Sequence, residues 1–171
     1  MKNIKFILST LLIILLTTVK SFSLIEVDIT RGNLNPLPVA VSPLSIDEKS
    51  KKSFENLLKK KDIGEEISVI VENNLRTSGL FNPLNKDAFL QAPDIANLKP
   101  RFEDWNLIKA QALITGKVTN IEDKLRVEFR LWDVLAGKEM MALAFTTVPT
   151  NWRRVGHIIS DKVYERLTGE K

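Results

Sequence analysis

The sequence has no cysteine and only one histidine, His157, among its 171 residues. Without cysteine the chain forms no disulfide, offers no thiolate nucleophile and carries no cysteine-linked lipid. Protein metal sites of the zinc type draw on several histidine and cysteine ligands, so no metal is expected. The glycine-rich phosphate loops and the HExxH zinc motif are also missing, and no cofactor is predicted.

The residues that resemble catalytic groups are poorly placed for catalysis. His157, Ser160 and Asp161 fall at i, i+3 and i+4 of one predicted helix, where the base cannot lie between nucleophile and orienting acid. A local His157–Asp161 pair on the helix flank is the simpler interpretation. The adjacent acids of Glu65–Glu66 and Glu103–Asp104 point to different faces of a helix. The sequence therefore predicts no enzyme, and a hydrolase using His157 and Asp161 is the least favoured hypothesis.

The one long apolar run lies at the N-terminus, from Phe6 to Val19, behind a short basic head. Ser21 and Ser23 place small residues at the −3 and −1 positions that a signal peptidase reads, although Lys20 weakens the site. We expect residues 1–23 to be a signal peptide, the mature chain to begin at Leu24, and the protein to be exported. The run is shorter than the ~20 residues that a membrane span needs, so no stable insertion is expected after cleavage. An uncleaved anchor and a buried N-terminal helix stay open as alternatives.

Most of the positive charge belongs to that signal. The net charge of +4 includes three lysines within residues 1–23 and no acid there, so the rest of the chain carries +1. The basic isoelectric point is therefore no sign of a nucleic-acid partner. Residues 24–171 are long enough for one domain with its own hydrophobic core.

Immediately after the expected cleavage site the chain alternates apolar and polar residues from Leu24 to Thr30. A period of two predicts a strand with one buried face, and Arg31–Pro36 then breaks it with turn residues. Such a terminal strand can pair as an ordinary edge strand of its own sheet, which composition favours, or can add to the sheet edge of another protein.

Periodicity places the remaining elements. A charge-rich stretch from Ile46 to Lys61 is interpreted as a solvated loop or helix flank, in preference to a lipid-binding segment. The capping-box spacing of Asp62 and Glu65 begins a helix that runs to Ser78 before Gly79. Thr150 or Asn151 is expected to cap the last helix. The predicted elements are strand Pro38–Pro43, helix Asp62–Ser78, an extended stretch at Leu80–Leu84, loop or short helix over 85–100, helix Arg101–Ala110, strands Ala112–Ile121 and Leu125–Val134, a third strand around Met141–Phe145, and helix Asn151–Leu167.

This order predicts an α+β fold in which two main helices pack on one face of a mixed β-sheet. Within the strand Leu125–Val134, the residues Val127, Phe129 and Leu131 are expected to face the core. The three tryptophans are scattered along the chain and are expected to pack in the core or at its edge.

Three separated motifs carry a resemblance to a known family. They are Leu75–Leu84 at the end of the first long helix, Ala112–Val118 preceded by Trp105, and Trp152–Gly169 with its Gly156-His157 pair. In this order they resemble the N-terminal domain of the TolB family, over about Leu24 to Gly169. The resemblance implies the same α+β fold, a periplasmic location and a structural role for His157.

The resemblance also implies partners. In that family the first mature residues bind the C-terminal domain of TolA, so a TolA-like domain is the expected partner of this chain. The implied partner-binding residues are Leu24, Ile25, Glu26, Val27, Asp28, Ile29 and Thr30. Family members continue into a six-bladed propeller that carries the main surface for Pal, and that surface has no counterpart before Lys171. Whether the chain is a piece of a longer protein or a free-standing domain is left open.

The function implied is a periplasmic protein–protein interaction module of the Tol–Pal system, which supports outer-membrane integrity and envelope constriction at cell division. The alternative hypothesis is a periplasmic adaptor for secretion or envelope assembly that binds through a helical face. Under that alternative, Arg153, Arg154 and Lys162 of the last helix are the residues that matter. It depends on analogy between folds.

Overall fold

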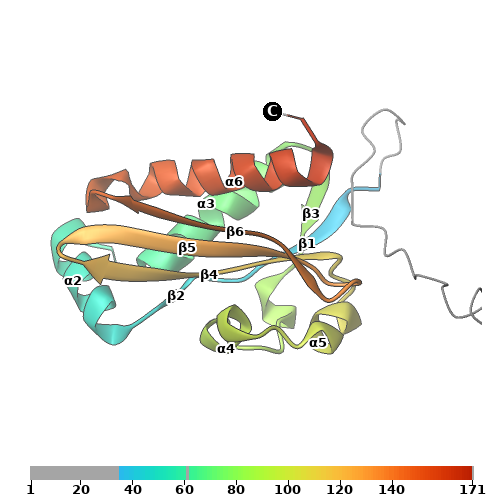
Figure 1. The fold of residues 1–171 in the computed structure, drawn as a ribbon, viewed down its shortest axis with the longest axis horizontal. Coiled ribbons are helices and arrows are strands. Elements are labelled where there is room, and N and C mark those ends of the chain that lie inside the picture. Colours follow the sequence, from blue (N-terminus) through green and yellow to red (C-terminus); the bar gives the residue numbers. More distant parts are fainter. Residues whose placement is uncertain (1–34, 61, 171) are drawn as a thin grey trace, which may run out of the picture.

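A mixed β-sheet with helices on both faces forms the body of the protein (Figure 1). The computed structural model describes residues 35–60 and 62–170. The strands are β1 (Leu37–Val41), β2 (Ser45–Ile46), β3 (Phe81–Pro83), β4 (Ala112–Ile121), β5 (Lys124–Asp133) and β6 (Lys138–Thr147). The helices are α2 (Glu48–Leu58), α3 (Ile63–Thr77), α4 (Pro93–Leu98), α5 (Phe102–Leu107) and α6 (Trp152–Thr168), with short 3-10 turns η1 (Lys86–Ala88) and η2 (Pro149–Asn151).

The strand order is β3-β1-β4-β5-β6, and β2 pairs separately with β4. β1 runs parallel to both of its neighbours, with Val39 opposite Pro83 on one side and opposite Ala112 on the other. From β4 onward the chain turns back twice to make an antiparallel meander. In the described part of the chain, β3 and β6 are therefore the outer strands of this order, and the two-residue β2 has β4 as its one partner.

Helices α3 and α6 lie against each other on one face of the sheet (Figure 1). Their apolar stripes meet the inward residues of β5, because every second strand residue points to the same face. Val127, Phe129 and Leu131 are all at most 1% exposed, as predicted. This arrangement confirms the predicted α+β fold with two main helices on one face.

The opposite face carries a smaller cluster around Trp105 of α5, which is 1% exposed. The buried Gln91 side chain organises the loop beside it. Its Oε1 accepts hydrogen bonds from Trp105 Nε1 and from the Arg101 backbone N–H, both at 3.0 Å. These bonds satisfy polar groups that would otherwise be costly to bury. None of the helices within residues 35–60 and 62–170 combines the length and the hydrophobicity of a membrane-spanning segment.

The N-terminal cap of α3 differs in one detail from the predicted capping box. Asp62 Oδ1 accepts from the backbone N–H groups of Gly64 and Glu65, at 3.0 and 3.1 Å. The Glu65 carboxylate instead forms an ion pair with Lys86, so only half of the reciprocal box is present. At the other end Gly79 has a φ of 75°, the left-handed conformation that ends a helix.

The charge-rich stretch that was expected to be a solvated loop or helix flank instead contains a helix of its own, α2, over Glu48–Leu58. Phe54 anchors that helix in the core at 1% exposure. Asp47 caps it by accepting from the Ser50 backbone N–H at 2.9 Å and from the Ser50 hydroxyl at 2.8 Å. The Ser50 oxygen in turn accepts from the Asn120 backbone N–H at 2.9 Å, which joins α2 to the end of β4.

Two smaller sequence predictions about element ends were wrong. Asn151 precedes α6, yet its side chain makes no cap; Asn151 Nδ2 donates instead to Thr147 Oγ1 at 3.1 Å. The strand predicted to begin at Pro38 begins at Leu37, so Pro38 lies inside β1, paired with Asn82.

Candidate partner-binding surfaces

The seven residues predicted to bind a partner, Leu24 to Thr30, lie outside the described residues. The described chain begins at Asn35 and enters the sheet at β1, where the Leu37 backbone N–H donates to Leu80 O at 2.9 Å. β1 lies between β4 and the three-residue β3. The described chain therefore enters the sheet one strand away from a short outer edge.

The predicted His157–Asp161 pair is not formed, although both residues lie in the described part of the chain. His157 Nδ1 lies 2.8 Å from Asn74 Nδ2, across the contact between α6 and α3. The same Asn74 amide donates to Ser160 Oγ at 3.0 Å, and the Ser160 hydroxyl donates to Gly156 O at 2.9 Å. The two contacts of Asn74 join the helices, the Ser160–Gly156 bond lies within α6, and a base poised against a nucleophile is absent from this cluster.

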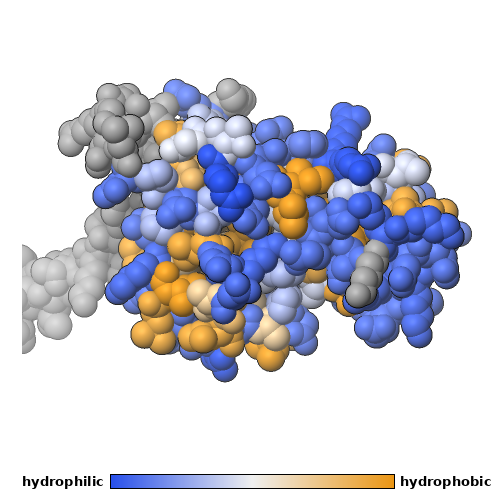
Figure 2. All heavy atoms as spheres, turned by 180° about the vertical axis from the view of Figure 1, so that it is seen from behind, coloured by the Kyte–Doolittle hydropathy of each residue, from blue (hydrophilic) through white to orange (hydrophobic). Residues whose placement is uncertain are grey.

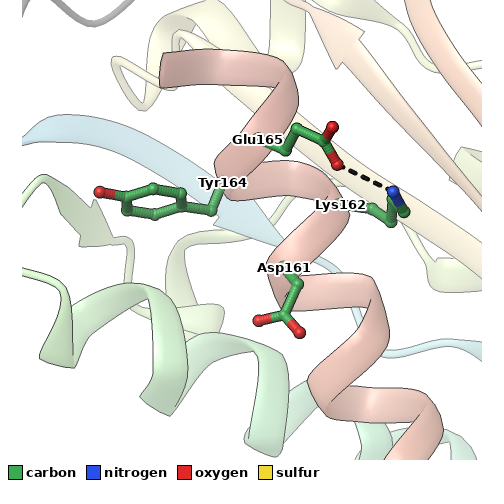
Figure 3. A pocket seen from close by; sticks show the side chains of 4 residues that line it. All are labelled: Asp161, Lys162, Tyr164 and Glu165. Atoms are coloured by element: carbon green, nitrogen blue, oxygen red, sulfur yellow. Dashed lines mark hydrogen bonds and ion pairs between the residues drawn. The ribbon is translucent and has the colours of Figure 1, made fainter. Parts of the chain in front are cut away.

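The residues of the alternative helical face are exposed on α6. The Arg153 guanidinium lies over the Trp152 ring, 4.3 Å from its centroid, and Lys60 Nζ lies 5.6 Å from the same centroid. Further along the helix Lys162 donates to Glu165 at 2.8 Å (Figure 3). Asp161 and Tyr164 line a hollow of about 340 Å³ with this pair. Because Lys162 is already paired with Glu165, only part of this basic face is open to the carboxylates of a partner.

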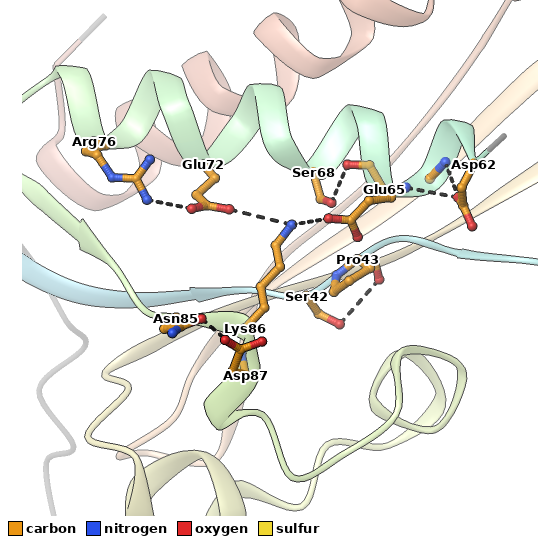
Figure 4. Close-up of polar contacts among 11 residues, drawn as sticks. Ser42, Pro43, Asp62, Glu65, Ser68, Glu72, Arg76, Asn85, Lys86 and Asp87 are labelled. Atoms are coloured by element: carbon orange, nitrogen blue, oxygen red, sulfur yellow. Dashed lines mark hydrogen bonds and ion pairs between the residues drawn. The ribbon is translucent and has the colours of Figure 1, made fainter. Parts of the chain in front are cut away.

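A second charged cluster lies between α3 and η1 (Figure 4). Lys86 Nζ points between Glu65 and Glu72, and Glu72 also pairs with Arg76 one turn later. Because each charge has an opposite neighbour, the cluster holds the loop after β3 against α3. Groups of three or more potential metal ligands are absent from residues 35–60 and 62–170.

A patch of hydrophobic side chains lies on the side of the molecule that carries α4 and α5 (Figure 2). Leu98, at the end of α4, is 84% exposed, and Leu107, at the end of α5, is 71% exposed. Ile95 adds another half-exposed side chain on α4. Periodicity did not single out this patch, because local sequence does not reveal what packs over a short helix.

A family model and a curated relative point to the same family. Residues 25–140 match the family model described as the TolB amino-terminal domain. Over 160 residues the chain is 79% identical to the Tol-Pal system protein TolB of Pelagibacter ubique (strain HTCC1062). That alignment covers 94% of this chain and 36% of the relative, so the chain spans about a third of the relative's length.

A solved structure supports the same fold. The crystal structure of TolB from Acinetobacter baumannii matches with a TM-score of 0.62 and 22% identity, covering 79% of this chain and 29% of that one. At this identity the match concerns the arrangement of strands and helices only. It agrees with the sheet and helix order described above.

Proposed function

Because the chain belongs to the TolB amino-terminal domain family, we propose that it acts as a periplasmic protein–protein interaction module of a Tol–Pal system. In this role it supports outer-membrane integrity and envelope constriction at cell division. The observation that carries the proposal is the 79% identity to a Tol-Pal system protein TolB over nearly the whole chain. Its proposed partners are a TolA-like C-terminal domain and, through the same system, Pal.

The proposed contact with the TolA-like domain is made by Leu24 to Thr30. Ile25, Val27 and Ile29 alternate with Glu26, Asp28 and Thr30, which suits a strand that adds to the edge of another sheet. Backbone hydrogen bonds supply affinity in such a contact, and the apolar side chains fix the register.

Deleting Leu24–Thr30 tests this contact. The deletion is expected to abolish capture by an immobilised TolA C-terminal domain and to leave the thermal unfolding midpoint unchanged. The matched control is a variant that keeps the composition of the segment and scrambles its order, which removes the alternation. Undiminished capture by the deletion variant would reject the strand as the binding element.

The proposed location depends on cleavage after Ser23. N-terminal sequencing of the protein recovered from a periplasmic extract is expected to begin at Leu24. Recovery of the intact N-terminus with the membrane fraction would contradict this proposal and favour an uncleaved anchor.

One observation favours a second candidate function, a periplasmic adaptor for secretion or envelope assembly that binds through α6. Arg153 and Arg154 are both exposed at the start of this helix. Reversing the charges of Arg153 and Lys162 to Glu would weaken partner capture under this hypothesis, and deletion of Leu24–Thr30 would leave capture intact. The two experiments therefore give opposite results for the two functions.

A further inference from the structure

The outer strand β6 offers unused backbone groups along much of its length. It pairs with β5 on one side, and no described strand pairs with its other side. In an edge strand, alternate residues direct N–H and C=O groups outward, where another extended chain can pair with them. β6 has ten residues, as does its neighbour β5.

The beginning of β6 is closed to such pairing. The register shifts there, since Leu131 pairs with Met141 and Trp132 with Glu139, which leaves Met140 as an extra residue. Arg166 of α6 donates to the Met140 carbonyl at 3.4 Å. A bulge with an occupied carbonyl obstructs a regular ladder, so the free stretch runs from Met141 to Thr147.

A groove follows this free stretch. A hollow of about 340 Å³ lies between Ala144–Thr147 of β6 and the first turns of α6. Phe145 forms part of its wall and stacks on Phe129 of β5 with their ring centroids 6.1 Å apart. Val155 and Ile158 supply the helical side. A strand added to β6 would place the apolar side chains of one of its faces in this groove.

Arg154 gives the groove its charge preference. It lines the hollow and is exposed. Within residues 35–60 and 62–170 its guanidinium has no hydrogen-bond or ion-pair partner. A guanidinium beside a strand edge attracts a carboxylate on the incoming chain. A second copy of β6 would supply none, because its free stretch contains no acidic residue.

We propose that the Met141–Thr147 edge of β6 is an acceptor site for an extended segment of another protein, in which apolar and acidic residues alternate. The segment adds a strand to the sheet, places its apolar side chains in the groove beside α6 and sets a carboxylate against Arg154. This site is separate from the proposed function above, in which the chain donates a strand to its partner.

The test uses the full chain and a peptide of alternating valine and glutamate, as long as the free stretch of β6. Amide hydrogen exchange is expected to slow in Met141–Thr147 on addition of the peptide. Arg154→Glu is expected to weaken peptide binding by at least ~10-fold, as for a close charge pair at an interface. The matched control is Lys99→Glu, which reverses a charge at an exposed position after α4 that does not line the groove.

Backbone methylation separates strand addition from simple charge attraction. Two peptides carry N-methyl groups on alternate amides, in opposite phases. One phase is expected to block binding and the other to leave it intact, because only alternate amides face β6. Equal binding by both peptides, or unchanged exchange in β6, would overturn the proposal. Dimerisation through β6 without peptide would overturn it as well.

Discussion

Asn74 and His157 join α3 to α6, with Asn74 Nδ2 2.8 Å from His157 Nδ1. The same Asn74 amide donates to Ser160 Oγ, so one side chain of α3 bonds two residues of α6. The sequence singled out His157 and Ser160 for their chemistry. Their observed role is to align two helices whose apolar stripes form the core.

Removal of Asn74 is expected to cost more stability than removal of His157. Asn74→Ala loses both hydrogen bonds to α6 and should lower the free energy of unfolding by about 1–2 kcal/mol. His157→Ala loses one bond at an exposed position and should cost about 0.5–1 kcal/mol. Urea denaturation of the two variants measures both values. A larger loss for His157→Ala would contradict this order.

Asp47 makes the stability of the protein depend on pH in the acid range. The Ser50 backbone N–H, with help from the Ser50 hydroxyl, lowers the pKa of Asp47 below its usual value of 3.8. The stability that this carboxylate contributes is complete above the unfolded pKa and is lost as the pH falls through the lower folded pKa. Asp47→Ala should therefore cost about 1 kcal/mol near neutral pH and progressively less in acid.

Denaturant midpoints measured from pH 7 downward compare this variant with the unchanged protein. The neighbouring Glu48→Ala serves as a control, because Glu48 does not accept from Ser50. A difference between Asp47→Ala and the unchanged protein that stays constant into strong acid would refute the assignment.

Substitution of Gly64 by alanine is expected to lower the stability of the protein, although Gly64 lies in a helix. Alanine normally favours a helix over glycine by about 1 kcal/mol. At this position a Cβ would lie 2.1 Å from Leu44 O, so either the start of α3 or the chain after β1 has to move. We expect Gly64→Ala to destabilise the protein by about 1–3 kcal/mol, a loss typical of overpacking.

Gly79→Ala is the matched control for this substitution. Gly79 has a φ of 75° and no atom near its added Cβ, so its substitution should cost only the backbone strain of about 1 kcal/mol. Thermal unfolding of both variants separates the steric clash at Gly64 from the backbone strain at Gly79. A stabilised Gly64→Ala protein would show that the close approach relaxes freely.

The turn between β4 and β5 offers a stabilising substitution. Glu122 and Asp123 both have positive φ values, of 50° and 61°, and lie between the paired residues Ile121 and Lys124. This two-residue turn favours Asn-Gly. Glu122→Asn with Asp123→Gly should raise the free energy of unfolding by about 0.5–1 kcal/mol, because glycine adopts the left-handed region without strain. Asp123→Ala, by contrast, should lower it.

The elements that the sequence predicted well are those with a single strong period. The alternation of β5 and the apolar stripes of α3 and α6 each identify one buried face, and the structure places those faces in one core. The helix α2 was missed because only Phe54 and Ser50 are buried among its charged residues. Its cap at Asp47 is an ordinary Asp-x-x-Ser pattern that identifies a helix start only when the helix itself is recognised.

The candidate surfaces were harder to predict, since they depend on which elements end up as neighbours. No local pattern indicates that β6 is an outer strand or that Arg154 lies beside it, because strand order is a long-range property. The same holds for Leu98 and Leu107, whose exposure reflects what α4 and α5 leave uncovered. The alternation of Leu24–Thr30 was read from sequence alone, and its pairing stays a prediction.

The position of β1 has a consequence for the order in which the strands of the sheet can assemble. Val39 pairs with Pro83 and with Ala112, both far later in the chain. Both pairings of β1 therefore require a large loop to close first, and long-range pairing of this kind is slow. The meander from β4 to β6 consists of short-range hairpins and can assemble sooner. β1 is then expected to join a sheet that β4, β5 and β6 have begun, and its apolar side chains are expected to stay exposed for longest during folding.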